Sequence, residues 1–209
     1  MSSTVLNDPR SAPPRTLPPA ERARARRTLL LLALVCVLPV VASYLAFYVW
    51  QPDGRTNYGE LITPTPLPTT GLQAAAGQPP LTAAEFEGRW TLVHAGPAAC
   101  GEPCLAALHT LRQVRLAQGK EMERVARVWL LTDHAPAAAI PSEDADGLRI
   151  ARIAADPTWL AALPGAETGA HIYLVDPLGN AMMRFPPAAD PKRMVKDLQR
   201  LLKYSALGR

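Results

Sequence analysis

The sequence lacks most of the short patterns that mark common catalytic and cofactor sites. It has only three cysteines and four histidines. There is no C-x-x-C-H haem motif, and no second C-x-x-C or H-x-x-x-H pair to complete a four-ligand zinc site. A phosphate-binding glycine loop and a G-x-S-x-G nucleophile elbow are missing too. These absences argue against a zinc domain, a haem protein, a nucleotide enzyme and a serine hydrolase.

Most of the chain also lacks net charge. The formal charge is +4, from 22 basic and 18 acidic residues. Residues 1–27 hold six arginines and two acidic residues, which leaves 16 basic and 16 acidic residues for the rest. A nucleic-acid partner needs a basic face on the folded domain, whereas this excess lies in a terminal tail. We therefore predict no nucleic-acid binding.

Residues 28–50 contain no charged side chain and are rich in Leu, Val and Ala. As a helix they would span roughly 34 Å, enough to cross the hydrocarbon core of a membrane. Four arginines precede this stretch, so the positive-inside rule puts the N-terminus in the cytoplasm. The alternative is a signal peptide cleaved near Ala42, but the apolar run continues to Trp50. Within the span, Cys36 is expected to be inert.

The composition divides the chain into four predicted segments. Residues 1–27 form a cytoplasmic Arg- and Pro-rich tail, and residues 28–50 form a transmembrane helix in a bacterial inner membrane. Residues 51–80, rich in Pro, Gly, Thr and Ala, are predicted to be a linker. Within that linker, residues 57–62 are compatible with either a short strand or a strap. Residues 81–209 form a periplasmic domain.

Strand-like and helix-like patterns alternate through this domain, which predicts an α/β sheet. Strands are expected at residues 90–94, 125–131, 149–153, 171–175 and 181–185, and helices after the cysteines and over 156–163 and 191–204. The order of strand, cysteine loop, helix, strand, helix, hairpin and helix is that of a thioredoxin-like fold. Asp176 to Asn180 is a hairpin signal between the last two strands.

Cys100 and Cys104 are the predicted site. They lie four residues apart where a strand gives way to a helix. The free amide groups and the dipole of a helix N-terminus favour thiolate over thiol, so the pair is expected to act as a nucleophile and as a soft metal ligand. With Cys100 in the loop, the sulfurs can form a disulfide or chelate one ion. Close cysteine pairs in exported domains also occur as purely structural cross-links.

At these residues the chain resembles the Sco family, membrane-anchored thioredoxin-like proteins that help to assemble the copper A centre of cytochrome c oxidase. The resemblance covers residues 86–185. It rests on Glu87-Gly88-Arg89-Trp90, Gly96 and the C-x-x-x-C pair, Leu130-Leu131-Thr132-Asp133, and Tyr173-Leu174-Val175-Asp176-Pro177 with Gly179. It implies copper bound by the two cysteines and a distal histidine.

The chain departs from that family pattern at two positions. Leu105 stands where the family has proline, and Thr168 stands where counting back from Tyr173 would meet the family's histidine. His171 is the nearest histidine, but the shift of three residues reverses the face to which a strand residue points. His171 is the first candidate for a third copper ligand, and His134, after the second strand, is the other.

Three functions remain open at this point. The first is a Sco-like assembly factor that holds Cu(I) or Cu(II) and delivers it to the copper-bearing subunit of a respiratory oxidase, or reduces the cysteines of that subunit. The second is a periplasmic thiol-disulfide oxidoreductase, in which Cys100 attacks, Cys104 resolves the mixed disulfide and a thiol reductant protein restores the pair. The third is a scaffold that binds an oxidase subunit without chemistry.

Overall fold

The computed structural model describes residues 18–48, 57–75, 77–153 and 157–205. The chain divides into two compact units, residues 1–54 and residues 55–209. In its described part the first unit is helix α1 (Pro19–Tyr48), along which the Leu and Val side chains are exposed. This helix is long and apolar enough to cross a bilayer, which indicates a membrane-anchored protein.

Helix α1 begins earlier than predicted. It starts at Pro19 instead of Thr28, because proline suits a first helical position and the Ala, Glu and Arg residues that follow are strong helix formers. Residues 49 and 50, the predicted end of the span, lie outside the described residues.

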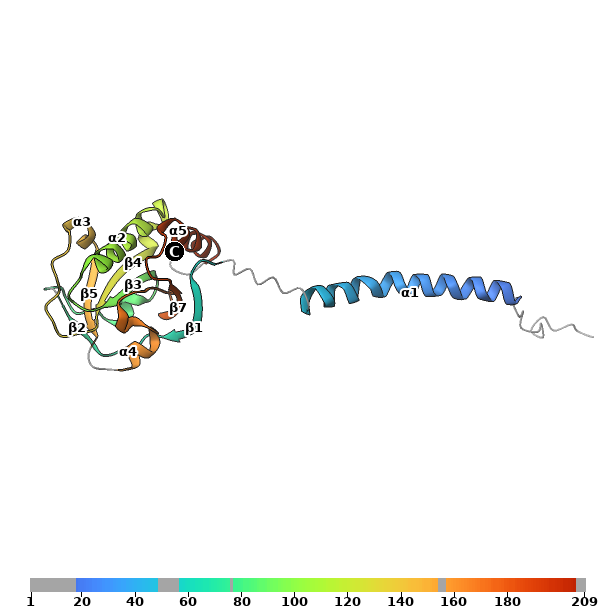
Figure 1. Ribbon diagram of the computed structural model, residues 1–209, viewed down its shortest axis with the longest axis horizontal. Coiled ribbons are helices and arrows are strands. Elements are labelled where there is room, and N and C mark those ends of the chain that lie inside the picture. Colours follow the sequence, from blue (N-terminus) through green and yellow to red (C-terminus); the bar gives the residue numbers. More distant parts are fainter. Residues whose placement is uncertain (1–17, 49–56, 76, 154–156, 206–209) are drawn as a thin grey trace, which may run out of the picture. The chain divides into compact units, whose positions relative to one another are not determined.

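The second unit is built on a seven-stranded sheet in the order β1-β7-β6-β3-β4-β5-β2. The strands are β1 (Glu60–Pro66), β2 (Leu72–Ala74), β3 (Trp90–Gly96), β4 (Val125–Leu131), β5 (Leu148–Ile153), β6 (Ile172–Val175) and β7 (Asn180–Phe185). Strands β3, β4 and β5 are parallel, and the other pairings are antiparallel. The sheet therefore has β3 at its centre and β1 and β2 at its edges (Figure 1).

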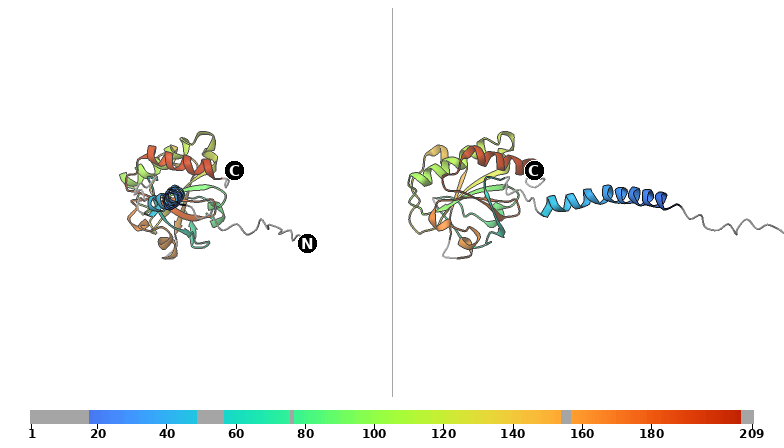
Figure 2. Two further views of the ribbon diagram at one scale, coloured as in Figure 1. Left: turned by 90° about the vertical axis from the view of Figure 1, so that its right-hand side faces the viewer. Right: turned by 45° about the vertical axis from the view of Figure 1, so that its right-hand side comes forward.

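Helices cover both faces of this sheet and create two cores. Helices α2 (Glu102–Leu116) and α5 (Pro191–Tyr204) lie on one face, and α4 (Pro157–Ala162) lies on the other (Figure 2). Along β3, Leu92 belongs to the first core and Val93 to the second, as alternation in a strand requires. Shorter elements complete the fold: α3 (Ser142–Ala145) and the 3₁₀ helices η2 (Ala83–Phe86), η3 (Gly119–Arg124) and η4 (Ala166–Thr168).

The predicted thioredoxin-like order of strands and helices is confirmed. Strand β4 and helix α5 have the predicted bounds, and the Asp176 carboxylate accepts hydrogen bonds from the amides of Leu178 and Asn180 in the expected hairpin. Strand β3 is longer than predicted, because Ala95 and Gly96 continue its pairing with β4. Asp156, the predicted cap of α4, lies outside the described residues.

The prediction of a linker over residues 51–80 is wrong from Tyr58 onward, because two strands of the sheet lie in this range. Strand β1 pairs with β7, and β2 pairs with β5. Both are edge strands, and an edge strand tolerates proline because one side of its backbone has no ladder partner. The sequence pattern therefore predicts a linker at Pro64 and Pro66, although both residues belong to strand β1.

A buried carboxylate on α5 holds the start of β1. The Asp197 Oδ2 atom accepts hydrogen bonds from the amides of Tyr58 (2.8 Å) and Gly59 (2.9 Å). Asp197 is 5% exposed, and the Tyr58 ring packs beside Phe185. The chain is thus fixed to the domain from Tyr58 onward.

We expect Asp197→Ala to lower the free energy of unfolding by about 1–3 kcal/mol, because two amides lose a buried acceptor. Urea unfolding of the detergent-solubilised chain measures the change. The control is Glu60→Ala on β1, which removes a half-exposed ion pair with Arg184 and should cost less than about 1 kcal/mol. An equal effect of the two substitutions would contradict this role of Asp197.

Candidate functional site

The two cysteines lie beyond the end of the central strand β3, where the chain leads into α2. Gly101 is the N-cap residue of α2, so Cys100 precedes the helix and Cys104 lies in its first turn. Three apolar side chains of α2, those of Leu108, Leu111 and Val114, are buried against the sheet and fix the direction of the helix. The cysteine pair therefore has a rigid support on both sides.

Cys100 and Cys104 form a disulfide, with their Cα atoms 5.1 Å apart. The position of Cys100 in the loop brings the two residues within bonding reach, as the sequence suggested. Both side chains are partly exposed and pack against the core between the sheet and α2. When the bond is reduced, the N-terminus of α2 favours the thiolate form of a cysteine beside it.

The segment that follows β4 holds the cysteine loop. The Asp133 carboxylate accepts hydrogen bonds from the amide of Ala98, at 3.1 Å to Oδ1 and 3.2 Å to Oδ2. The amide of Ala138 donates to the Ala98 carbonyl at 2.9 Å. Arg152 of β5 donates to the Asp133 carbonyl and so steadies the segment. This role of Asp133 was not predicted from the sequence, although Asp133 lies in the stretch that carries the family resemblance.

A second segment reaches the cysteine loop from the other side. A Cβ atom added to Gly96 would lie only 2.9 Å from the Cα of Gly169, and one added to Gly169 would lie 3.1 Å from Pro97. Gly169 has a φ of +65°, a conformation that glycine adopts without strain. Two glycines thus let the loop before β6 pass against the end of β3.

His171 does not join the cysteines. Its ring packs against Tyr173, which belongs to the core on the α4 side of the sheet, whereas α2 and the cysteines are on the other side. The His171 Nδ1 atom lies 2.9 Å from the Phe185 carbonyl oxygen and donates to it. Thr168, at the position of the family's histidine, is an exposed residue of η4.

The remaining histidines lie apart from the cysteine pair or are enclosed in the fold. His134 is exposed in the loop after β4, and His109 pairs with Asp144 at 3.2 Å. Among the described residues, no three His, Cys, Asp or Glu side chains gather closely enough to hold a metal ion. The structure therefore offers two sulfurs for a metal, and neither predicted histidine beside them.

His94 is buried in β3, six positions before Cys100. Its Nδ1–H group donates to the His171 carbonyl at 3.3 Å, and its Nε2 atom has no hydrogen-bond partner within the described part of the chain. Burial lowers the pKa of His94 below its ordinary value, and the hydrogen bond to His171 offsets this only in part. His94 is consequently neutral in the folded domain at neutral pH.

An apolar hollow of about 370 Å³ lies beside Pro103, the residue that precedes Cys104. It lies between the first turns of α2 and the loop that precedes α5, and Gly169 and Ala170 close its end. Its lining is Pro103, Ala106, Ala107, Thr110, Gly169, Ala170, Ile172 and residues 186–189. The hollow is thus lined mainly by small apolar side chains and lies near the disulfide.

A family model described as a transmembrane-like, thioredoxin-like, C-terminal domain matches residues 90–205. No curated protein sequence matches the chain. The matched range includes β3, the cysteine pair and α5, and so covers the elements that build the site.

Several solved structures resemble the domain. The apo Sco1 protein of Thermus thermophilus is 19% identical, with 71% of this chain and 99% of that chain covered at a TM-score of 0.49. Yeast Sco1 with copper bound is 14% identical, with 75% and 100% covered at 0.49. The thioredoxin domain of a thiol-disulfide oxidoreductase from Bacteroides vulgatus is 17% identical, with 68% and 99% covered at 0.49. Similarity at this level does not by itself indicate a function.

We expect His94 to make the stability of the domain depend on pH. The unfolded chain binds a proton at His94 as the pH falls through about 6.5, whereas the folded chain resists protonation until its lowered pKa is reached. The contribution of His94 to the free energy of unfolding is therefore full above pH 6.5 and declines as the pH falls below 6.5. The His94→Leu variant should show a flatter decline in urea midpoint between pH 7 and pH 5 than the wild type.

The slope of stability against pH is the quantity to compare, because His94→Leu also changes packing. The control is His134→Gln, in the exposed loop, which should keep the wild-type slope. A slope unchanged in His94→Leu would show that His94 is not the residue that resists protonation.

Proposed function

The chain belongs to the family of transmembrane-like, thioredoxin-like C-terminal domains, and from this membership and the cysteine pair we propose a Sco-like thiol redox function. The reduced Cys100–Cys104 pair passes electrons to a disulfide in the copper-bearing subunit of a respiratory oxidase. A thiol reductant protein then restores the pair. The proposal sets the domain in the periplasm of a bacterium, with α1 in the inner membrane.

The disulfide at the N-terminus of α2 carries this proposal. Its cysteines are close enough to bond, partly exposed, and held by Asp133 on one side and by the Gly96–Gly169 contact on the other. The apolar hollow beside Pro103 supports the same function, because a partner disulfide must approach within a chain segment. Both features favour exchange with a protein over a static cross-link.

The exchange balances without a further reactant. The Cys100 thiolate attacks one sulfur of the partner's disulfide, a mixed disulfide forms, and the partner's other sulfur leaves as a thiolate. The Cys104 thiolate then attacks the Cys100 sulfur, and the partner is released with two thiols. The partner gains two electrons and two protons, and the Cys100–Cys104 disulfide is left for the reductant.

A second candidate function is transport of Cu(I) to the same subunit. Two reduced thiolates are soft ligands that suit Cu(I), and the resemblance to the Sco family favours copper as cargo. The position of His171 on the far face of the sheet argues against a Cu(II) site that His171 completes. Copper binding by the cysteines alone is compatible with the redox function, since both use the reduced pair.

We expect Cys104→Ser to trap the mixed disulfide, because the resolving thiol is lost while Cys100 still attacks. The full chain in nanodiscs is reduced, freed of reductant and mixed with an oxidised soluble copper domain of an oxidase subunit. A non-reducing gel and mass spectrometry measure the adduct. Cys100→Ser should yield much less adduct, and Cys36→Ser should behave as the wild type.

Absence of an adduct in both single-cysteine variants, with no reduction of the partner by the wild type, would make the redox proposal wrong. If replacing both cysteines then left oxidase assembly in cells unchanged, the scaffold function would be favoured.

The copper function has its own expected result. Anaerobic titration of the reduced chain with Cu(I), against a competing chelator, should show one tightly bound ion that is lost when either Cys100 or Cys104 is replaced by serine. His171→Ala and His134→Ala should leave the affinity unchanged, because the structure puts neither beside the cysteines. Weaker Cu(I) binding in His171→Ala would contradict that arrangement.

A further inference from the structure

Helix α5 presents a stripe of positive charge. Its five basic residues are all exposed. At 100° per residue they fall within about 100° around the helix axis. The five are Lys192, Arg193, Lys196, Arg200 and Lys203, and we call them the basic stripe. Asp190 caps the helix, and Asp197 is buried against the start of β1, so the stripe itself includes no carboxylate.

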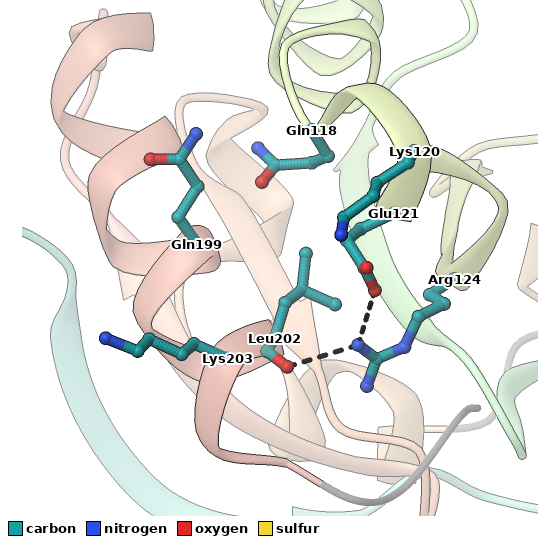
Figure 3. Close-up of a pocket in the computed structure, with 7 residues that line it drawn as sticks. All are labelled: Gln118, Lys120, Glu121, Arg124, Gln199, Leu202 and Lys203. Carbon is teal, nitrogen blue, oxygen red and sulfur yellow. Dashed lines mark hydrogen bonds and ion pairs between the residues drawn. The ribbon is translucent and has the colours of Figure 1, made fainter.

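The positive surface continues beyond the helix. A hollow of about 670 Å³ between η3 and the end of α5 is lined by Lys120, Arg124 and Lys203 together with Glu121 (Figure 3). Arg124 donates to Glu121 and to the Leu202 carbonyl, which joins η3 to α5. All four lysines of the sequence lie on the basic stripe or in this hollow. Positive charge is therefore concentrated on this surface, although residues 28–209 together contain equal numbers of basic and acidic residues.

The chain enters the domain beside the basic stripe. The Arg193 guanidinium lies 4.0 Å from the centre of the Tyr58 ring, and the Tyr58 hydroxyl accepts a hydrogen bond from the Asp190 amide. The Tyr58 amide in turn donates to Asp197 of the same helix. Three contacts of Tyr58 with α5 and its N-cap residue thus fix the point from which the chain leads back to α1.

The chain between α1 and this point is short. Helix α1 ends at Tyr48 and the fixed segment begins at Tyr58. The chain between them reaches at most about 3.3–3.6 Å per residue, on the order of 35 Å in total. If α1 spans a membrane, α5 is tethered near the membrane surface whatever path the connecting residues take.

We propose that the basic stripe docks on the anionic phospholipid headgroups of the membrane that holds α1. Lysine and arginine side chains near a negatively charged bilayer surface are attracted to it, and five on one helix face act together. Tyr204 supports this occupant, because it is 77% exposed at the end of α5, and tyrosine favours the membrane interface. The docking fixes the orientation of the domain above the bilayer, and with it the position of Cys100 and Cys104.

The stripe is placed to control that orientation. Phe185, at the end of β7, pairs with Ile172, which pairs with His94 near the cysteine end of β3. Helix α5 follows β7, so its first turns lie at the same end of the sheet as the disulfide. A domain docked through α5 holds the disulfide at a constant distance from the bilayer surface, where a partner in the same membrane can reach it.

Lysine labelling tests the proposal on the full chain. The protein is reconstituted in nanodiscs of pure phosphatidylcholine, or of phosphatidylcholine with one-quarter phosphatidylglycerol, and acetylated briefly. Mass spectrometry gives the labelling rates of Lys192 and Lys203. We expect both rates to be several-fold lower in the anionic discs at low salt, and the difference to disappear at high salt, because screening removes the attraction.

A variant separates docking from a general effect of the anionic surface on amine reactivity. Lys196→Glu reverses the charge in the middle of the stripe and leaves both reporter lysines, so it should abolish most of the protection. The matched control, Thr69→Glu with Gln73→Glu, makes the same change in net charge at exposed positions before and within β2, and should keep the protection.

Equal labelling rates in the two kinds of disc would overturn the proposal, as would protection that survives Lys196→Glu. An acidic protein partner, the rival occupant of the stripe, predicts equal rates in both discs. These results are independent of the redox proposal, because no variant in the labelling experiment alters a cysteine.

Discussion

The junction between β3 and α2 is the constraint on which the site depends. β3 is the central strand, covered on both faces and paired on both sides, and its last residue, Gly96, passes within contact of Gly169. A side chain at Gly96 would push the loop before β6 away from the cysteine loop. Backbone contact between the two loops therefore sets where Cys100 and Cys104 lie, and the Asp133 carboxylate holds the opposite side of the same loop.

This arrangement favours thiol-disulfide chemistry at the two cysteines over a metal site with several protein ligands. The disulfide is held at a helix N-terminus beside an apolar hollow, whereas His171 points to the other core and His134 lies in an exposed loop. The residue at the family's histidine position is Thr168. The chain thus has the cysteine pair of the Sco family, but among the described residues no histidine lies beside that pair. For this reason thiol-disulfide exchange is the function that the geometry supports best.

Because β1 and β2 belong to the sheet, the segment between α1 and the domain is much shorter than the composition suggested. Tyr58, near the start of the described residues of the domain, contacts α5, the helix of this domain that has the most basic residues. The balance of charge over residues 28–209 conceals this asymmetry, since most of the compensating carboxylates lie at other positions in the chain.

Much of the fold and half of the site followed from the sequence alone. The apolar run at residues 125–131 predicted β4, and the helical spacing of apolar residues at 191–204 predicted α5, because burial on one or two faces leaves such a pattern in the chain. The C-x-x-x-C spacing at a strand-to-helix boundary predicted that the two sulfurs can either form a disulfide or chelate one ion, and the structure contains the disulfide. Only the tertiary structure decided that Pro64 and Pro66 belong to a strand, because an edge position removes the usual penalty for proline. Only the tertiary structure decided, too, that Asp133 and Gly169 hold the cysteine loop and that His171 faces away. Those relations join residues far apart in the chain through hydrogen bonds and backbone contacts, which no local pattern encodes.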